Sequence, residues 1–103
     1  MLENKANIEA KNGYGSTPLH LASGKGNLDV VKTLLEHEAN TEAKNKSGRT
    51  PLHWASYEGK LDVVKTLLEN KANIEVKEKY KKRTPLHLAS NKGKPDVVKT
   101  LLE

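Results

Sequence analysis

Hydrophobic residues recur along this chain in three blocks of the same design. Each block places a leucine and an alanine three positions apart, and Val-Val and Leu-Leu pairs begin eight residues after that alanine. Spacings of three and four residues put side chains on one face of a helix. Each block therefore predicts two amphipathic helices, the second with the broader apolar face. The apolar positions are Leu19, Ala22, Val30, Val31, Leu34 and Leu35 in the first block, Leu52, Ala55, Val63, Val64, Leu67 and Leu68 in the second, and Leu86, Ala89, Val97, Val98, Leu101 and Leu102 in the third.

The residues between these apolar positions predict where the helices begin and end. Each block opens with Thr-Pro-Leu-His, in which the threonine hydroxyl can cap the first helix and the proline suits its first turn. A glycine stands where each first helix should end, and glycine readily takes the left-handed conformation found there. Each second helix has an aspartate in its first turn, where a carboxylate complements the helix dipole. The first helices should lie between Thr17 and Gly26, Thr50 and Gly59, and Thr84 and Gly93, and the second helices should begin near Leu28, Leu61 and Pro95.

The three Thr-Pro-Leu-His segments stand 33 and 34 residues apart, a period typical of a repeat solenoid. Each segment, with the block that follows it, resembles the ankyrin repeat, which carries T-P-L-H-x-A before two antiparallel helices and a β-turn. The resemblance covers essentially the whole chain and implies an all-α repeat solenoid of about three stacked helix-turn-helix units with β-hairpin loops. We expect one domain over residues 1–103: the end of a preceding partial repeat (1–11), two repeats (12–44 and 45–77) and a truncated third (78–103).

One departure from the family pattern falls after each second helix. Ankyrin repeats usually carry a glycine there, and this chain does not. A residue with a side chain must then turn the chain, so we expect some strain or fraying at these helix ends. The residues concerned are Lys5, Glu38 and Lys71, with Asn4 and Asn70 as neighbours that could take the turn instead.

The third hairpin departs from the first two. It is one residue longer, and Lys82 stands where the other hairpins have Gly15 and Gly48. We expect this hairpin to be distorted or mobile.

No polar capping repeat is visible at either end of the array. Arrays normally end in atypical, more polar repeats, because the outermost apolar face would otherwise meet water. We therefore expect either a fragment of a longer array or a protein whose end faces associate.

The net charge of +5 is unevenly distributed. The three segments that precede Thr-Pro-Leu-His, 11–16, 44–49 and 77–83, carry +1, +3 and +4, so the rest of the chain carries −3. A basic stripe on a mildly acidic body attracts negatively charged partners over long range, and salt weakens that attraction. The alternative interpretation of the segment 77–83 is an ordinary solvated loop.

Composition narrows the classes of protein that need to be considered. The chain has no cysteine, so nothing suggests a disulfide framework or a thiolate metal site. Its beginning lacks the apolar core of a signal peptide, and no apolar run approaches the roughly 18 residues of a membrane span. We expect a soluble, cytoplasmic protein that does not interact with membranes.

Three histidines occupy the same position in successive repeats, at His20, His53 and His87. Successive helices lie about 8–10 Å apart, which is too far for these side chains to share one metal ion. We expect each imidazole to bond near its own threonine hydroxyl and to tie one repeat to the next. No nucleophile motif, phosphate loop or metal motif stands out, so we expect no enzyme activity, no catalytic or metal-binding residue and no cofactor.

Candidate binding residues lie where the repeats differ, because structural roles repeat while recognition residues need not. Proteins that resemble this one bind partners on a concave surface formed by hairpin tips and the exposed side of the first helices, and the differences fall there. Trp54 and Tyr57 give the second repeat a large aromatic pair of a kind that anchors interfaces. The equivalent positions in the other two repeats carry leucine, which implies at least partial burial, so the alternative remains that Trp54 only fills space. The candidate residues are Tyr14, Ser16, Lys25, Lys46, Arg49, Trp54, Tyr57, Tyr80, Lys82, Arg83, Asn91 and Lys92.

These observations favour a non-catalytic protein-binding module whose partner has an acidic surface. Nucleic-acid binding through the same basic edge is the first alternative, and it would show a steep dependence on salt. Self-association through stacked end faces is the second, and it would build dimers or filaments by a head-to-tail contact. We expect either a monomer or weak end-to-end association.

Overall fold

The computed structural model describes residues 5–103, which form six helices arranged as three pairs. The expected all-α stack of about three repeats is confirmed. Within residues 5–103 no segment forms a β-strand, so the hairpin loops are closed by turns rather than by a strand ladder. The helices are α1 (Pro18–Lys25), α2 (Leu28–Glu36), α3 (Pro51–Glu58), α4 (Leu61–Glu69), α5 (Pro85–Asn91) and α6 (Pro95–Leu102).

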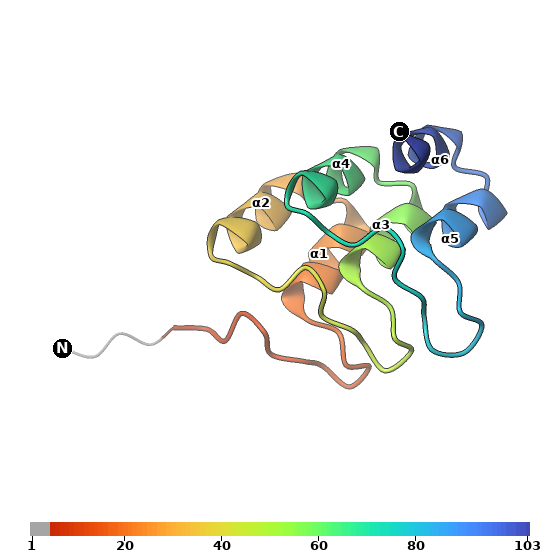
Figure 1. The fold of residues 1–103 in the computed structure, drawn as a ribbon. Coiled ribbons are helices and arrows are strands. Elements are labelled where there is room, and N and C mark those ends of the chain that lie inside the picture. The colour runs from red at the N-terminus through yellow and green to blue at the C-terminus, as the bar shows by residue number, and fades with distance from the viewer. Residues whose placement is uncertain (1–4) are drawn as a thin grey trace.

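The helices lie in two rows, and the hairpins extend from one side of the stack (Figure 1). Helices α1, α3 and α5 pack side by side in an inner row, and α2, α4 and α6 form an outer row. The molecule measures 50 × 27 × 20 Å. We call each hairpin with the helix pair that follows it the first, second or third repeat.

Each inner helix begins as its sequence predicts. The hydroxyl of Thr17 accepts a hydrogen bond from the His20 amide, and Nδ1 of His20 accepts one from the Thr17 amide at 3.0 Å. This reciprocal pair satisfies two amides that a helix N-terminus otherwise leaves without a partner. The same arrangement recurs at Thr50 and at Thr84. Threonine and histidine therefore fix the start of all three inner helices.

Helices α1 and α3 end at Gly26 and Gly59, which have φ of 74° and 71°. Helix α5 ends one residue earlier, at Asn91. Its C-cap Lys92 keeps a right-handed conformation, and Gly93, with φ of 68°, turns the chain next.

The outer helices α2 and α4 end without glycine, and the predicted strain is present. Glu38 and Lys71 each adopt φ of 66°, a left-handed conformation that side chains disfavour. Lys71 rather than Asn70 takes the turn, and Asn4 lies outside the described residues. Of the two expected outcomes, strain or fraying, these two ends show strain. Both are closed by hydrogen bonds, as where the Ala39 amide donates to the Leu34 carbonyl at 3.0 Å.

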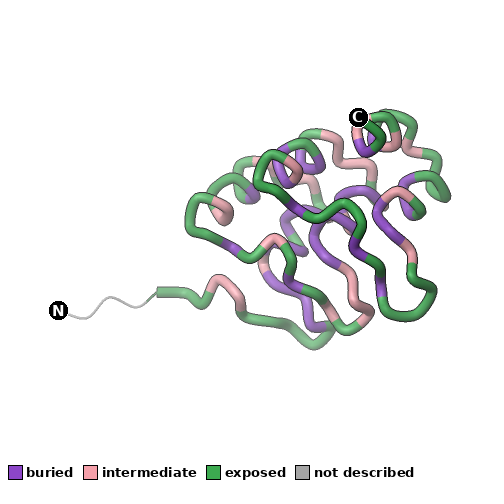
Figure 2. Tube along the Cα trace, in the orientation of Figure 1, coloured by how far each residue is buried: buried purple, intermediate pink, exposed green. Residues whose placement is uncertain are grey.

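The core lies between the two rows and between successive repeats (Figure 2). Leu19 and Leu52 of the inner row are each 1% exposed. Ala55 and Ala89 are fully buried, and their small side chains let the inner helices approach closely. Because each repeat covers its neighbour, the core is continuous along the stack.

Candidate partner-binding surface

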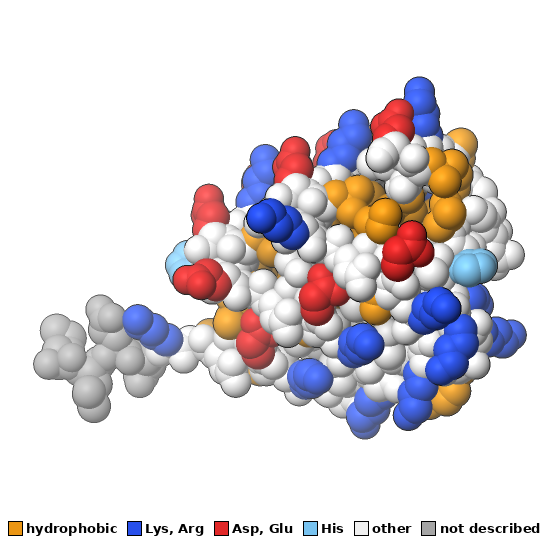
Figure 3. All heavy atoms as spheres, in the orientation of Figure 1, with side chains coloured by type: hydrophobic (Ala, Val, Ile, Leu, Met, Phe, Trp, Pro, Cys, Tyr) orange, Lys and Arg blue, Asp and Glu red, His pale blue; other side chains and the backbone are white. Residues whose placement is uncertain are grey.

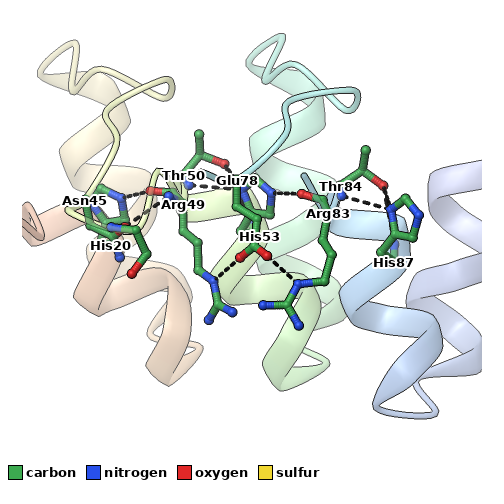
Figure 4. Close-up of polar contacts among 10 residues, drawn as sticks. His20, Asn45, Arg49, Thr50, His53, Glu78, Arg83, Thr84 and His87 are labelled. Atoms are coloured by element: carbon green, nitrogen blue, oxygen red, sulfur yellow. Dashed lines mark hydrogen bonds and ion pairs between the residues drawn. The ribbon is translucent and has the colours of Figure 1, made fainter. Parts of the chain in front are cut away.

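The buried histidines link successive repeats. Nδ1 of His20 accepts from the Thr17 amide, so its Nε2 carries the proton and donates to the Arg49 carbonyl at 2.8 Å. His53 repeats this arrangement with the Arg83 carbonyl at 2.9 Å (Figure 4). The predicted structural role of these two histidines is confirmed, and the bonds hold each hairpin against the inner helix of the preceding repeat.

Burial keeps these two imidazoles neutral. Desolvation lowers the pKa of His20 and of His53 below the usual 6.5, although the hydrogen bonds to the Arg49 and Arg83 carbonyls act in the opposite direction. Residues 5–103 contain no group of three or more His, Asp or Glu side chains placed to hold a metal ion.

The first two hairpins are closed by an asparagine. The side-chain oxygen of Asn12 accepts from the amides of Tyr14 and Ser16 at 2.9 and 3.0 Å. Asn45 accepts in the same way from the amides of Ser47 and Arg49 at 2.9 and 3.0 Å. Asparagine at this position therefore shapes a short, regular hairpin from within.

The third hairpin has Glu78 at the position of these asparagines, and its carboxylate binds arginines instead of amides. One oxygen accepts from Nε of Arg49, in the preceding hairpin, at 2.8 Å, and the other accepts from Nε of Arg83. The Glu78 side chain is only 2% exposed. Lys82 takes a left-handed conformation with φ of 57°. The predicted distortion of this hairpin is thus confirmed, and its mobility stays a prediction.

Glu78 is ionised in this setting. Burial alone would raise its pKa, but the hydrogen bonds and positive charges of Arg83 and Arg49 outweigh burial and hold the pKa of this carboxyl below its usual 4.5. Each oxygen of this buried carboxylate has a charged donor, and removal of either arginine would leave part of its charge uncompensated.

The two arginines present their remaining donors away from Glu78. Each binds this carboxylate through Nε, and Figure 4 shows the terminal nitrogens of both guanidinium groups directed away from it. The side chains of Arg49 and Arg83 are 26% and 32% exposed. Tyr57 lies beside Arg49, whose guanidinium is 5.9 Å from its ring centre, and the Lys92 ammonium is 4.8 Å from the same ring centre, so both are within cation–π range. We call Arg49, Tyr57, Glu78, Arg83 and Lys92 the central cluster.

Trp54 packs between the first and second repeats. A Cβ atom added to Gly24 would lie 2.6 Å from Cε3 of Trp54, so the indole rests directly on the backbone of α1. Trp54 is half-buried, and its Nε1 is buried without a hydrogen-bond partner among the described residues. The space-filling interpretation of Trp54 therefore has direct support, and only its exposed part is available to a partner.

The other candidate residues differ in exposure and position. Ser16 is buried at 2% exposure and takes no part in the surface proposed below. Tyr14 and Tyr80 are exposed on the first and third hairpins, and the Lys79 ammonium lies 5.5 Å from the Tyr80 ring centre. The remaining candidates Lys25, Lys46, Lys82 and Asn91 are exposed.

Positively charged side chains predominate over the hairpins, and side chains of both signs lie near the outer helices (Figure 3). Figure 3 shows lysine and arginine gathered over the hairpins, with acidic side chains mainly above them towards the outer helices. A groove of about 670 Å³ separates the second and third hairpins. Lys44, Lys46, Lys77, Lys79 and Lys82 line it, together with Asn45, Gly48 and Glu78.

Sequence reasoning missed Glu78 and three lysines of the groove, Lys44, Lys77 and Lys79. Glu78 counted only as one negative charge in a basic run. The available signal was its alignment with Asn12 and Asn45, since a structural asparagine that changes to glutamate must lose the local amide bonds. Lys44 and Lys77 carry no signal of this kind, because lysine also stands at the equivalent Lys11, and a residue that recurs in every repeat indicates a structural role.

Comparison with protein families agrees with this architecture. A family model described as "Ankyrin repeats (3 copies)" matches residues 1–78, and a model described as "Ankyrin repeat" matches residues 81–103. No individual curated protein matches the chain. None of the helices in the described part combines the length and hydrophobicity that crossing a membrane requires.

Proposed function

Since the chain belongs to the ankyrin repeat family, we propose that it is a non-catalytic module that binds a protein partner with an acidic surface. Ankyrin repeats are generally protein–protein interaction modules and are typically not catalytic. The partner meets the hairpins and the inner helices, with the central cluster at the middle of the contact.

The observation that carries this proposal is the pair of arginines held by Glu78. Their shared carboxylate fixes both side chains, so less rotamer entropy is lost when a partner binds. Their free terminal nitrogens can donate to carboxylates, and charge-assisted bonds of this kind are stronger than neutral ones. Tyr57 adds apolar area beside them, and tyrosine and arginine are the residue types that dominate binding energy at interfaces.

The lysine-lined groove contributes mainly to the rate and selectivity of association. Its five ammonium groups produce a positive potential along the hairpin edge, and such a potential attracts acidic partners before contact. Since these charges face solvent, their effect falls as ionic strength rises.

The test compares two double variants with the same charge. Lys46→Glu with Lys92→Glu changes the hairpin edge and the central cluster, whereas Lys32→Glu with Lys65→Glu changes exposed positions on the outer helices α2 and α4. Both lower the net charge from +5 to +1, so they differ only in where the charge is placed. Neither touches Arg49 or Arg83, because losing those residues would leave Glu78 buried without a partner.

Each variant, immobilised, is used to capture proteins from a nuclease-treated lysate at low and high salt. We expect a discrete protein that the wild type and the outer-helix variant retain and the hairpin variant loses. Equal capture by all three proteins would refute the proposed surface. If a single-stranded oligonucleotide displaces the captured protein completely, nucleic-acid binding is favoured instead. The same holds if the oligonucleotide is the only ligand that the hairpin variant fails to bind.

A further inference from the structure

Lysines from both sides line the groove between the second and third hairpins. They are Lys44 and Lys46 from the second hairpin and Lys77, Lys79 and Lys82 from the third. All five side chains are exposed, and Figure 3 shows the basic side chains gathered over the hairpins. Five like charges around a space of about 670 Å³ repel one another, so a multivalent anion bound between them relieves that repulsion.

The acidic residue that lines the groove does not balance these lysines. Glu78 uses one carboxylate oxygen for Arg49 and the other for Arg83, so its charge is already compensated. A carboxylate of a partner carries one negative charge, whereas a phosphate monoester carries about −1.5 to −2 and has three strong acceptor oxygens. Lysine binds phosphate as a point charge. The groove therefore suits a phosphate better than a single carboxylate.

The third hairpin also leaves backbone donors without partners. In the second hairpin, Asn45 accepts from the amides of residues 47–49 through its side chain and its carbonyl. Glu78 stands in place of this asparagine, and in the described part of the chain the amides of residues 80–83 have no hydrogen-bond acceptor. Lys82 holds φ of 57°, and successive amides in a turn of this kind form a concavity that binds anions. The exchange of asparagine for glutamate thus frees donors on the turn that carries Lys82.

A protein segment fits this surface better than a nucleic acid. A single-stranded nucleic acid needs positive charge along its backbone and aromatic side chains on which successive bases stack. Here the charge is concentrated, since the segments 44–49 and 77–83 carry +3 and +4 and the segment 11–16 carries only +1. A concentrated charge suits one phosphorylated residue and its neighbours.

The groove is continuous with the central cluster, because Glu78 lines the groove and binds both arginines. We propose that the groove receives a phosphorylated residue of the protein partner, while acidic side chains next to that residue bind Arg49 and Arg83. This inference rests on the proposed function and specifies its partner as a protein with a phosphorylated acidic segment. The lysines then hold the phosphate in addition to attracting the partner over long range.

The experiment compares two synthetic peptides by isothermal titration calorimetry at physiological ionic strength. One carries a phosphoserine flanked by glutamates, and the other carries two adjacent aspartates in place of the phosphoserine, so their net charges are nearly equal. We expect the phosphoserine peptide to bind about tenfold more tightly, because its three phosphate oxygens accept charge-assisted bonds at one point of the groove. A purely electrostatic attraction would give the two peptides the same affinity.

Two double variants test whether the phosphate lies in the groove. Lys44→Gln with Lys77→Gln removes one lysine from each side of the groove, whereas Lys25→Gln with Lys81→Gln removes two exposed lysines that do not line it. Each variant removes two positive charges from the net charge of +5. We expect the groove variant to lose about tenfold in affinity for the phosphoserine peptide, and the control variant to lose about twofold. Circular dichroism checks that both remain folded.

Several results would overturn the inference. Equal affinities for the two peptides, or equal losses in the two variants, would mean that the groove does not distinguish phosphate from other negative charge. Inorganic pyrophosphate that binds as tightly as the phosphoserine peptide would assign the groove to a small anion. A single-stranded oligonucleotide that binds more tightly than the peptide, with the same dependence on Lys44 and Lys77, would assign it to nucleic acid.

Phosphatase treatment of the lysate separates failure of this inference from failure of the proposed function. We expect the protein that the wild type captures to be lost after this treatment. A protein that is still captured after treatment, and that the variant Lys46→Glu with Lys92→Glu fails to capture, would support the acidic partner and overturn the phosphate site. Equal capture by the wild type and that variant would instead refute the proposed surface itself.

Discussion

Oε1 of Glu78 lies 2.8 Å from Nε of Arg49, although the two residues are 29 positions apart and belong to different hairpins. The other oxygen of the same carboxylate binds Arg83, within the third hairpin. The first two hairpins are closed by an asparagine from within, so the third hairpin has exchanged a local closure for a link to its neighbour. This exchange joins the second and third repeats and orients both arginines.

Replacing Glu78 with glutamine should destabilise the protein by about 1–3 kcal/mol, because charge-assisted bonds to two arginines are lost at a buried position. The free energy of unfolding from urea titration measures this. Glu58→Gln, at an exposed position of α3, removes the same charge without a buried partner and should change stability by less than about 0.5 kcal/mol. Equal effects of the two substitutions would show that only net charge matters.

Stability should decrease as the pH falls below about 6.5. Burial lowers the pKa of His20 and His53 in the folded state, so the unfolded chain binds more protons below its own pKa of 6.5, and protonation favours unfolding. This contribution is fully present above pH 6.5 and is lost as the pH falls towards the lowered folded values. Urea titrations at a series of pH values measure the slope.

A second loss should follow at lower pH. The folded-state pKa of Glu78 lies below 4.5, so its stabilisation is present above pH 4.5 and is lost as the pH falls through the folded value. Glu78→Gln should remove this second loss. Since the Glu78 charge raises the pKa of His53, its removal should lower that pKa further and make the decrease near pH 6.5 somewhat larger. A variant whose profile simply runs parallel to that of the wild type below pH 4.5 would contradict the assignment.

Glycine at the left-handed helix ends should stabilise the protein. Glu38 and Lys71 both hold φ of 66°. Relieving the clash of a side chain with the backbone there gains about 1–2 kcal/mol, less about 0.4–1 kcal/mol for the greater entropy that glycine gives the unfolded chain. We therefore expect Glu38→Gly and Lys71→Gly each to raise the free energy of unfolding by about 0.5–1 kcal/mol. Lys65→Gly, inside the exposed face of α4, is the control and should lower it by about 1 kcal/mol.

Gly24 should tolerate alanine only when Trp54 is absent. In the wild type the new methyl group would meet the indole at 2.6 Å, and overpacking of this kind costs about 1–3 kcal/mol. In a Trp54→Leu background, Gly24→Ala should be neutral or stabilising, since alanine favours a helix over glycine. A double-mutant cycle measured by thermal and urea unfolding gives the coupling, and additive effects would contradict the close contact.

Much of the fold follows from the sequence because the signals are local. Thr17 and Pro18 start a helix, and Gly26 ends it, through contacts within a few residues that are the same in any tertiary setting. The repeat period adds the stacking, since three blocks with the same apolar pattern can bury their apolar faces only against one another. The left-handed turns at Glu38 and Lys71 were also foreseeable, because the absence of glycine at a helix end is visible in the sequence.

The candidate site was less accessible, because its contacts join residues about 30 positions apart. The sequence by itself determined the helices, their caps, the basic hairpin edge and the link between repeats through His20 and His53. Only the tertiary structure decided that Glu78 binds Arg49 and Arg83, that Trp54 rests on Gly24 and that Ser16 is buried. The physical reason is that stacking brings each hairpin against the next, and the directions of long side chains across that contact depend on packing that no single repeat contains.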